Sequence, residues 1–239
     1  MRRICVTAIT ATLLFCGAAW PQSSQWVTIG RNAFAFHEEQ FHDLKVKMEA
    51  PVVADSEIFI EMIGIPNTAK INELRLQIRR VLGLGNAVAL EADGYRTIAF
   101  DPDWAVSDTP SFYLTLGHEA GHHFCGHSVG RGPRDNVQIE LEADQFGGAS
   151  VKRYEIYHGR PFFNQVFAAA VAKYSEQGSF YPARASRLEA LKRGYEQGSA
   201  CGNLAPVIQR GYTPPARNTG APTPCRPVQT GPTSWACAH

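Results

Sequence analysis

The chain has 239 residues, 44% of them hydrophobic and 19% charged, with a formal net charge of +1. This length suits one globular domain with extensions. The charges are balanced and no run of basic residues occurs, which argues against a protein that binds DNA or RNA. The apolar content argues against a wholly disordered chain.

Residues 1–19 have the pattern of an export signal. Arg2 and Arg3 precede an uncharged stretch that ends in small residues, where a signal peptidase would cut. We therefore expect an exported protein, periplasmic or secreted, with no membrane span in its mature form. Two alternatives stay open. One is an uncleaved anchor, for which the stretch is a little short. The other is a lipoprotein signal at Cys16, which the bulky Phe15 disfavours.

Four cysteines follow this segment: Cys125, Cys201, Cys225 and Cys237. An oxidising compartment favours two disulfides, for which three pairings are possible. We favour Cys125–Cys201 within the domain and Cys225–Cys237 near the end of the chain, where the loop to be closed is short. Free buried thiols are the alternative.

The remaining chain divides into a domain, residues 20–202, and a tail, residues 203–239. Seven of the fifteen prolines lie in the tail. A segment of this composition buries too little apolar surface to offset the entropy lost on ordering. We expect the tail to be largely irregular.

The first half of the domain is predicted to contain one helix and two strands. Apolar residues recur at helical spacing over residues 69–82, which predicts an amphipathic helix. Short apolar runs at residues 86–90 and 96–100 flank the turn signal Asp93-Gly94 and predict two strands.

Four helices are predicted after these strands. Thr109 is the expected N-cap of the first, and Pro110 is its first helical residue. The four helices are expected over residues 110–125, 135–157, 164–175 and 183–196. Helices combined with one small sheet predict an α+β domain.

The helix that begins at Pro110 contains the sequence HEAGH. His118 and His122 are four residues apart, so they lie on one helix face and both imidazoles can reach one ion. Glu119 lies beside them, where a carboxylate can hold and deprotonate a metal-bound water. The composition gives about 0.016 chance matches to this pattern in the chain. A set of histidines on a solvated helix face is the alternative.

A catalytic zinc ion normally has three protein ligands. On the next predicted helix, Glu140 and Asp144 share a face. Glu140 can ligate the ion, while Asp144 accepts the ring N–H of a ligand histidine. We interpret Glu142, which points away from that face, as a surface charge, and His123 and His127 as supporting residues rather than ligands.

The segment HEAGHH followed by ELEADQFGG resembles the gluzincin zinc metallopeptidases. The most similar branch contains HtpX-like and CAAX-prenyl-protease-like enzymes with their soluble single-domain relatives, the minigluzincins. The resemblance extends over about residues 86–191. It implies a single small zincin-type α+β domain with an active-site helix, a small sheet with an edge strand within residues 86–100, and a second helix that carries Glu-x-x-x-Asp.

The resemblance also assigns roles to individual residues. It implies His118, His122 and Glu140 as ligands of one Zn²⁺ per chain and Glu119 as the general base. It further implies Asp144 as the residue that orients a ligand histidine.

Tyr181 stands where this family usually has a histidine that is thought to help stabilise the oxyanion. A tyrosine hydroxyl can donate a hydrogen bond for the same purpose. Tyr181 can equally be a packed residue at the start of a helix. Both interpretations stay open.

These features predict a zinc-dependent endopeptidase acting on extended protein or peptide substrates. In that mechanism Glu119 activates a zinc-bound water and then protonates the leaving amine. Two alternatives use the same residues. One is a non-catalytic zinc-binding module with a partner-binding or chaperone-like role, and the other is a zinc amidase that acts on a non-protein substrate. The oligomeric state is not predicted.

Overall fold

A computed structural model describes most of the domain and two strands near the end of the chain. The described residues are 25–29, 44–64, 67–127, 136–176, 181–199, 201, 226–231 and 234–238. The chain divides into two compact units, residues 1–207 and residues 208–239. The predicted export signal lies outside the described residues, so export stays a prediction.

The second unit contains an antiparallel hairpin of β6 (Arg226–Gly231) and β7 (Ser234–Ala238). Sequence analysis expected a largely irregular tail and did not anticipate this hairpin. Cys225 lies outside the described residues, so the Cys225–Cys237 disulfide stays a prediction.

The first unit contains a small mixed sheet in the order β3-β5-β4. The central strand β5 (Tyr95–Phe100) pairs in parallel with β3 (Leu76–Arg80) and antiparallel with β4 (Ala87–Ala92). In the part of the chain that the structure describes, β4 therefore forms an edge of this sheet. The two predicted strands correspond to β4 and β5. A separate antiparallel pair consists of β1 (Gln25–Ile29) and β2 (Leu44–Met48).

The predicted helix over residues 69–82 is wrong in its second half. The chain forms a short helix α2 (Thr68–Glu73), adopts a positive φ at Arg75, and continues as strand β3. The side chains from Leu76 to Arg79 are all buried, so both faces of β3 are covered. Tertiary pairing with β5 therefore overrides the helical spacing, because it satisfies the backbone of a segment buried on both sides.

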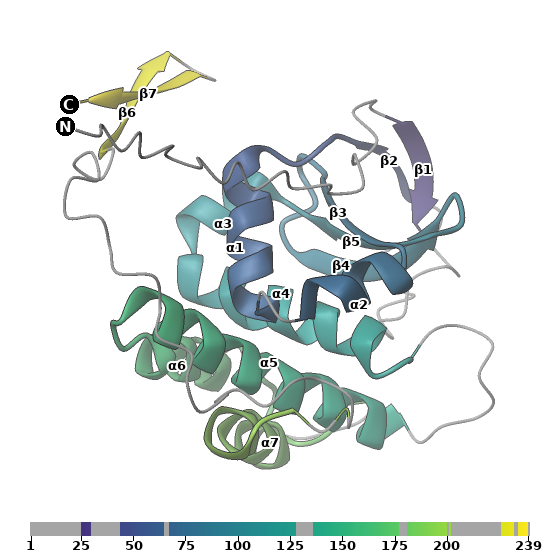
Figure 1. The fold of residues 1–239 in the computed structure, drawn as a ribbon, viewed down its shortest axis with the longest axis vertical. Helices are drawn as coiled ribbons and strands as arrows, with labels where there is room; N and C mark the ends of the chain where they lie inside the picture. Colours follow the sequence, from purple (N-terminus) through teal and green to yellow (C-terminus); the bar gives the residue numbers. More distant parts are fainter. Residues whose placement is uncertain are drawn as a thin grey trace, which may run out of the picture. The chain divides into compact units, whose positions relative to one another are not determined.

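Six further helices belong to the described part of the first unit. They are α1 (Val53–Ile63), α3 (Pro102–Ser107), α4 (Thr109–Phe124), α5 (Asn136–His158), α6 (Phe163–Lys173) and α7 (Arg184–Gln197). In Figure 1, α4 lies between the sheet and α5, and α7 lies on the far side of α5. No helix among the described residues is long and apolar enough to cross a membrane.

Alternate residues of the sheet pack on opposite sides of it, as the two-residue period of a strand requires. Ala87 and Ile98 belong to a large apolar core shared with the helices. Val88 and Ala99 belong to a smaller core with Val46 of β2. The sheet thus joins two layers, and α4 lies on the larger core.

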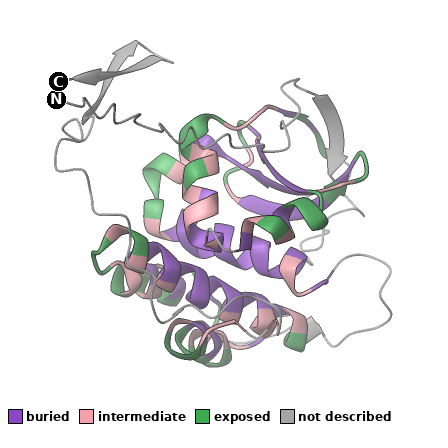
Figure 2. Ribbon diagram, in the orientation of Figure 1, coloured by how far each residue is buried: buried purple, intermediate pink, exposed green. Residues whose placement is uncertain are grey.

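Helix α4 and its N-cap both begin one residue earlier than the sequence predicted, at Thr109 and Asp108. The Asp108 carboxylate accepts a hydrogen bond from the Ser111 backbone N–H at 3.2 Å, and Pro110 occupies the first turn. An acidic side chain at this position also interacts favourably with the helix dipole. Every residue of α4 from Ser111 to His123 is buried, as Figure 2 shows by the colour of this helix.

Two glycines allow α5 to lie directly against α4. A Cβ added at Gly121 would lie 2.8 Å from the Ala143 Cα, and one added at Gly117 would lie 3.0 Å from the Gly147 Cα. Since real Cβ atoms essentially never lie under 3.0 Å from such an atom, Gly121 requires glycine, while an alanine at Gly117 would force its neighbours to move by a few tenths of an ångström. The close approach brings side chains on the facing side of α5 next to the histidines of α4.

Helices α5 and α7 are in close contact at Gly148 of α5 and Gly194 of α7. This contact gives a stability prediction. A Cβ added at Gly148 would lie 1.9 Å from the Leu191 carbonyl oxygen, which is rigid backbone. We expect Gly148→Ala to lower the free energy of unfolding by about 3 kcal/mol or more, because the helices must separate.

The measurement is chemical denaturation followed by circular dichroism. Ala185→Ser is the control, since it also adds one heavy atom, at an exposed position of α7. Equal stability of Gly148→Ala and the wild type would contradict this packing.

Candidate metal centre and catalytic cleft

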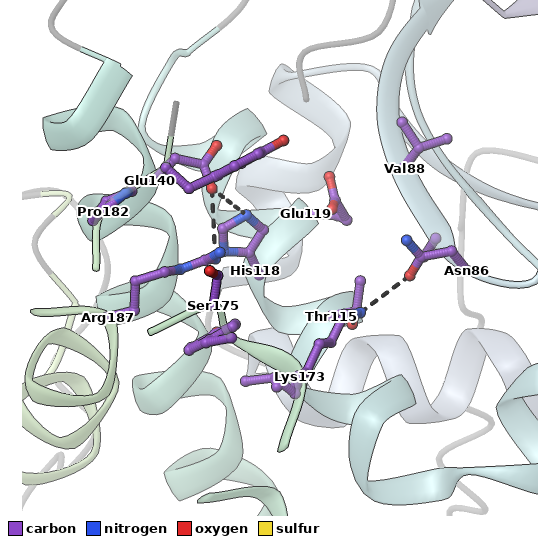
Figure 3. A pocket seen from close by; sticks show the side chains of 14 residues that line it. Asn86, Val88, Thr115, His118, Glu119, Glu140, Lys173, Ser175, Pro182 and Arg187 are labelled. Atoms are coloured by element: carbon purple, nitrogen blue, oxygen red, sulfur yellow. Dashed lines mark hydrogen bonds and ion pairs between the residues drawn. The ribbon is translucent and has the colours of Figure 1, made fainter. Parts of the chain in front are cut away.

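Three side chains of α4 and α5 converge on one point. His118 Nε2 lies 3.0 Å from His122 Nε2 and 3.3 Å from Glu140 Oε2, and His122 Nε2 lies 3.6 Å from Glu140 Oε1. All three residues are buried. They are the three ligands that the sequence predicted, and the structure brings them together. Figure 3 shows two of them, His118 and Glu140.

The spacing of these atoms suits a metal ion. A tetrahedral ion bound to nitrogen and oxygen at about 2.0–2.2 Å keeps its ligand atoms about 3.3 Å from one another. The three measured distances, from 3.0 to 3.6 Å, lie on both sides of this value. His118, His122 and Glu140 could therefore hold one metal ion.

A second group of possible ligands consists of Cys125, His127 and Glu142. The structure joins Cys125 to Cys201 with a Cα–Cα distance of 5.0 Å, the disulfide that the sequence favoured. The sulfur of Cys125 is therefore bonded to another sulfur, which leaves this second group with two available ligands.

Asp144 fixes the orientation of His118. Its Oδ1 accepts a hydrogen bond from His118 Nδ1–H at 2.9 Å, which leaves Nε2 directed at the triad. Asp144 also accepts two hydrogen bonds from Arg187 of α7, at 2.7 and 2.9 Å, and one from the Tyr174 hydroxyl at 2.8 Å. This is the role that the sequence gave to Asp144. Arg187 and Tyr174 had no predicted role.

The electrostatics of this cluster favour an ionised Asp144. Burial acts to raise the pKa of Asp144, but the Arg187 guanidinium and His118 hold that pKa below its usual value. Burial acts to lower the pKa of His118, but the carboxylates of Glu140 and Asp144 raise it to about 10. A buried acidic cluster of this kind favours a positive charge at the triad.

A second chain of hydrogen bonds orients His122. The ring nitrogens His122 Nδ1 and His127 Nδ1 lie 3.1 Å apart, and His127 Nε2 lies 2.8 Å from Glu142 Oε2. Since the carboxylate can only accept, His127 donates from Nε2 and accepts at Nδ1, so His122 donates from Nδ1. The interpretation of Glu142 as a surface charge was therefore wrong.

The two chains have the same consequence for both histidines. His118 and His122 each donate their Nδ1 proton outward, which directs Nε2 of both rings at the triad. Burial holds the pKa of His122 well below its usual value, which keeps this ring neutral. His123, by contrast, donates from Nε2 to the Thr97 carbonyl oxygen at 3.1 Å and takes no part in the triad.

Glu119 lies beside the triad, on the side that faces β4 (Figure 3). Its Oε2 accepts a hydrogen bond from the Ala89 backbone N–H at 2.8 Å, and only 4% of the residue is exposed. Burial raises the pKa of Glu119 to about 7. A carboxylate with such a pKa can both take up and release a proton near neutral pH.

A cleft opens next to these residues. It is lined from the β4 side by residues 86–88, from α4 by Leu114, Thr115, His118 and Glu119, and from the other helices and their flanking segments by Glu140, Lys173, Tyr174, Ser175, Tyr181, Pro182 and Arg187. Tyr181 thus faces the same space as the triad, with its ring 5.7 Å from the Arg187 guanidinium carbon.

Comparisons of the chain with protein families, curated proteins and solved structures give no match.

The His127 link to His122 gives a testable prediction. We expect His127→Ala to weaken binding of a metal ion at the triad about 10- to 100-fold, because His122 loses the acceptor that fixes its tautomer. Competition with a chromogenic chelator measures the affinity. His158→Ala is the control, since His158 pairs instead with Glu61, at 2.8 Å. Wild-type affinity in His127→Ala would show that the link does not support the metal centre.

Proposed function

We propose that the protein is a zinc-dependent endopeptidase of the gluzincin type that cleaves extended peptide segments. One observation carries the proposal. The buried triad of His118, His122 and Glu140 lies beside the partly protonatable carboxylate of Glu119, on a cleft bordered by an edge strand.

The donor set of the triad supports zinc as the metal. Two imidazoles and one carboxylate are a typical set for catalytic zinc, which keeps a further position open. The neutral His122 ring and the paired supporting residues of both histidines fit the same ion. When bound, zinc would lower the pKa of a coordinated water and polarise a substrate carbonyl.

Glu119 is suited to carry the proton of the reaction. The Ala89 N–H holds Oε2, and no described residue hydrogen-bonds Oε1. That oxygen can take a proton from the attacking water and return it to the leaving amine. The rigid hydrogen bond to β4 keeps the carboxylate in place between these two transfers.

The backbone of β4 can bind the substrate. The Ala89 N–H points away from β5, since it bonds to Glu119. Alternate residues of an antiparallel strand direct their polar groups to the same side, so Ala87 presents its N–H and C=O there as well. An extended peptide can add to this edge through main-chain hydrogen bonds.

The substitution Glu119→Gln tests the role of this carboxylate. It keeps the shape of the side chain but removes its ability to accept and release a proton. We expect one bound zinc per chain and a loss of turnover of about 10³-fold or more, measured by mass spectrometry on a peptide library. Glu189→Gln, at an exposed position of α7, is the control. Full activity of Glu119→Gln would contradict the assignment.

Another prediction concerns Tyr181. Burial raises the pKa of this tyrosine above its usual value, so its hydroxyl stays protonated and can donate. If it stabilises the oxyanion, Tyr181→Phe lowers kcat by about 10²-fold with little change in KM. Steady-state kinetics on one cleaved peptide measure both constants. An unchanged kcat would show that Tyr181 is a packing residue.

A further inference from the structure

We propose that Lys173, with Asn86 and Thr115, forms a site in the cleft that binds a carboxylate of the substrate. The proposal rests on the peptidase function proposed above and names a preference within it. The carboxylate is either an acidic side chain or the carboxyl terminus of the peptide.

The three residues meet from three different elements. Lys173 is the last residue of α6, and its Nζ donates to Thr115 Oγ1 of α4 at 2.8 Å and to Asn86 Oδ1, just before β4, at 3.2 Å. All three line the cleft that holds His118 and Glu119. Figure 3 shows the side chain of Lys173 extending toward Thr115, below His118 and Glu119 in this view.

The charge of Lys173 is not neutralised at close range. Both of its hydrogen-bond acceptors are neutral, and no carboxylate of the described residues lies within ion-pair distance of its Nζ. Glu119 and Asp108 act on it only at longer range. An ammonium has three N–H donors. Two of those of Lys173 bind Thr115 and Asn86, and Nζ also lies 5.3 Å from the centre of the Trp104 ring, a weak contact that an anionic ligand can replace.

The other cation that lines the cleft is differently placed. Arg187 is held by Asp144 at 2.7 and 2.9 Å and lies 3.5 Å from Glu140. Its charge is therefore used within the metal centre. Among the described cleft residues, Lys173 is the cation that can bind an anionic group of a substrate.

The position of Lys173 indicates which part of a substrate it contacts. Asn86 is three residues before Ala89, whose N–H binds Glu119, and three residues of strand span about 10 Å. A peptide that pairs antiparallel with β4 runs toward the Asn86 end. In that orientation the carboxylate lies two or three residues after the cleaved bond.

A structural role alone makes a different prediction. If Lys173 only ties α6 to α4 and β4, its replacement lowers stability and leaves the charge preference of the enzyme unchanged. The ratio of the kcat/KM values of two substrates, measured with the same variant, separates these roles. A loss of folded protein lowers the apparent kcat/KM of both substrates equally and leaves their ratio unchanged.

The experiment compares peptides that carry Glu, Gln or Lys at each position around one cleaved bond, all with amidated ends. A parallel pair differs only in a free or amidated carboxyl terminus. The zinc-loaded wild type, Lys173→Met and Lys173→Glu are tested. Lys192→Met is the control, since Lys192 lies on the exposed side of α7.

For the wild type we expect kcat/KM to be about tenfold higher for Glu than for Gln at one position after the bond, or for the free over the amidated terminus. In Lys173→Met the ratio of kcat/KM for the Glu and Gln peptides should fall to about one. In Lys173→Glu the Lys peptide should be cleaved more efficiently than the Glu peptide. Lys192→Met should keep the wild-type ratio. A wild type without a charge preference, or a preference that persists in Lys173→Met, would overturn the proposal.

A binding measurement keeps the test independent of turnover. The zinc-loaded Glu119→Gln protein is titrated with fluorescent Glu and Gln peptides, with and without Lys173→Met. Tighter binding of the Glu peptide that depends on Lys173 supports the site even if the wild type cleaves nothing, in which case only the peptidase proposal fails. Equal binding of both peptides would overturn the carboxylate site.

Discussion

The close approach of α4 and α5 is the constraint on which the rest of the structure depends. Gly121 lies against the backbone of Ala143, so the two helices are separated by less than ordinary side chains allow. Only at this distance can Glu140 and Asp144 reach the His118 ring at 3.3 and 2.9 Å. The close approach at Gly117 and Gly121 of α4 is therefore as necessary to the candidate metal centre as His118 and His122.

Burial then determines the charges at the centre. Glu140 and Asp144 are almost fully buried, while one guanidinium, that of Arg187, offsets part of their negative charge. Arg187 reaches them because α7 packs closely on α5 at Gly148 and Gly194. The remaining negative charge favours a cation at the triad, so the packing of three helices also creates the conditions for the proposed metal binding.

The local spacing of residues was sufficient to predict the triad and Asp144. His118 and His122, and likewise Glu140 and Asp144, are four residues apart on long helices, where the fold follows the pattern. The same reasoning failed for residues 69–82, because pairing of β3 with β5 joins segments that are distant in sequence. It also failed for Glu142, whose partner His127 lies on a segment beyond the end of α4.

Lys173 shows a further limit of sequence reasoning. A lysine at the end of a helix is typical of a solvated helix terminus, and nothing in its neighbours indicates a cleft. Its position follows from long-range contacts to Thr115 and Asn86, which are 58 and 87 residues away in the chain. Arg187 and Tyr174 meet Asp144 over similar separations, 43 and 30 residues. The sequence was sufficient to indicate the candidate metal ligands, while the residues that surround them are brought together by the tertiary fold.

Zinc-edge X-ray absorption spectroscopy of the protein loaded with one zinc ion tests the central claim most directly. The account predicts four nitrogen or oxygen ligands at about 2.0–2.2 Å, two of them with the scattering of imidazole, and no sulfur. A Zn–S distance of about 2.3 Å would place the ion at cysteine instead. Such a result, or a failure to bind zinc at all, would contradict a centre formed by His118, His122 and Glu140.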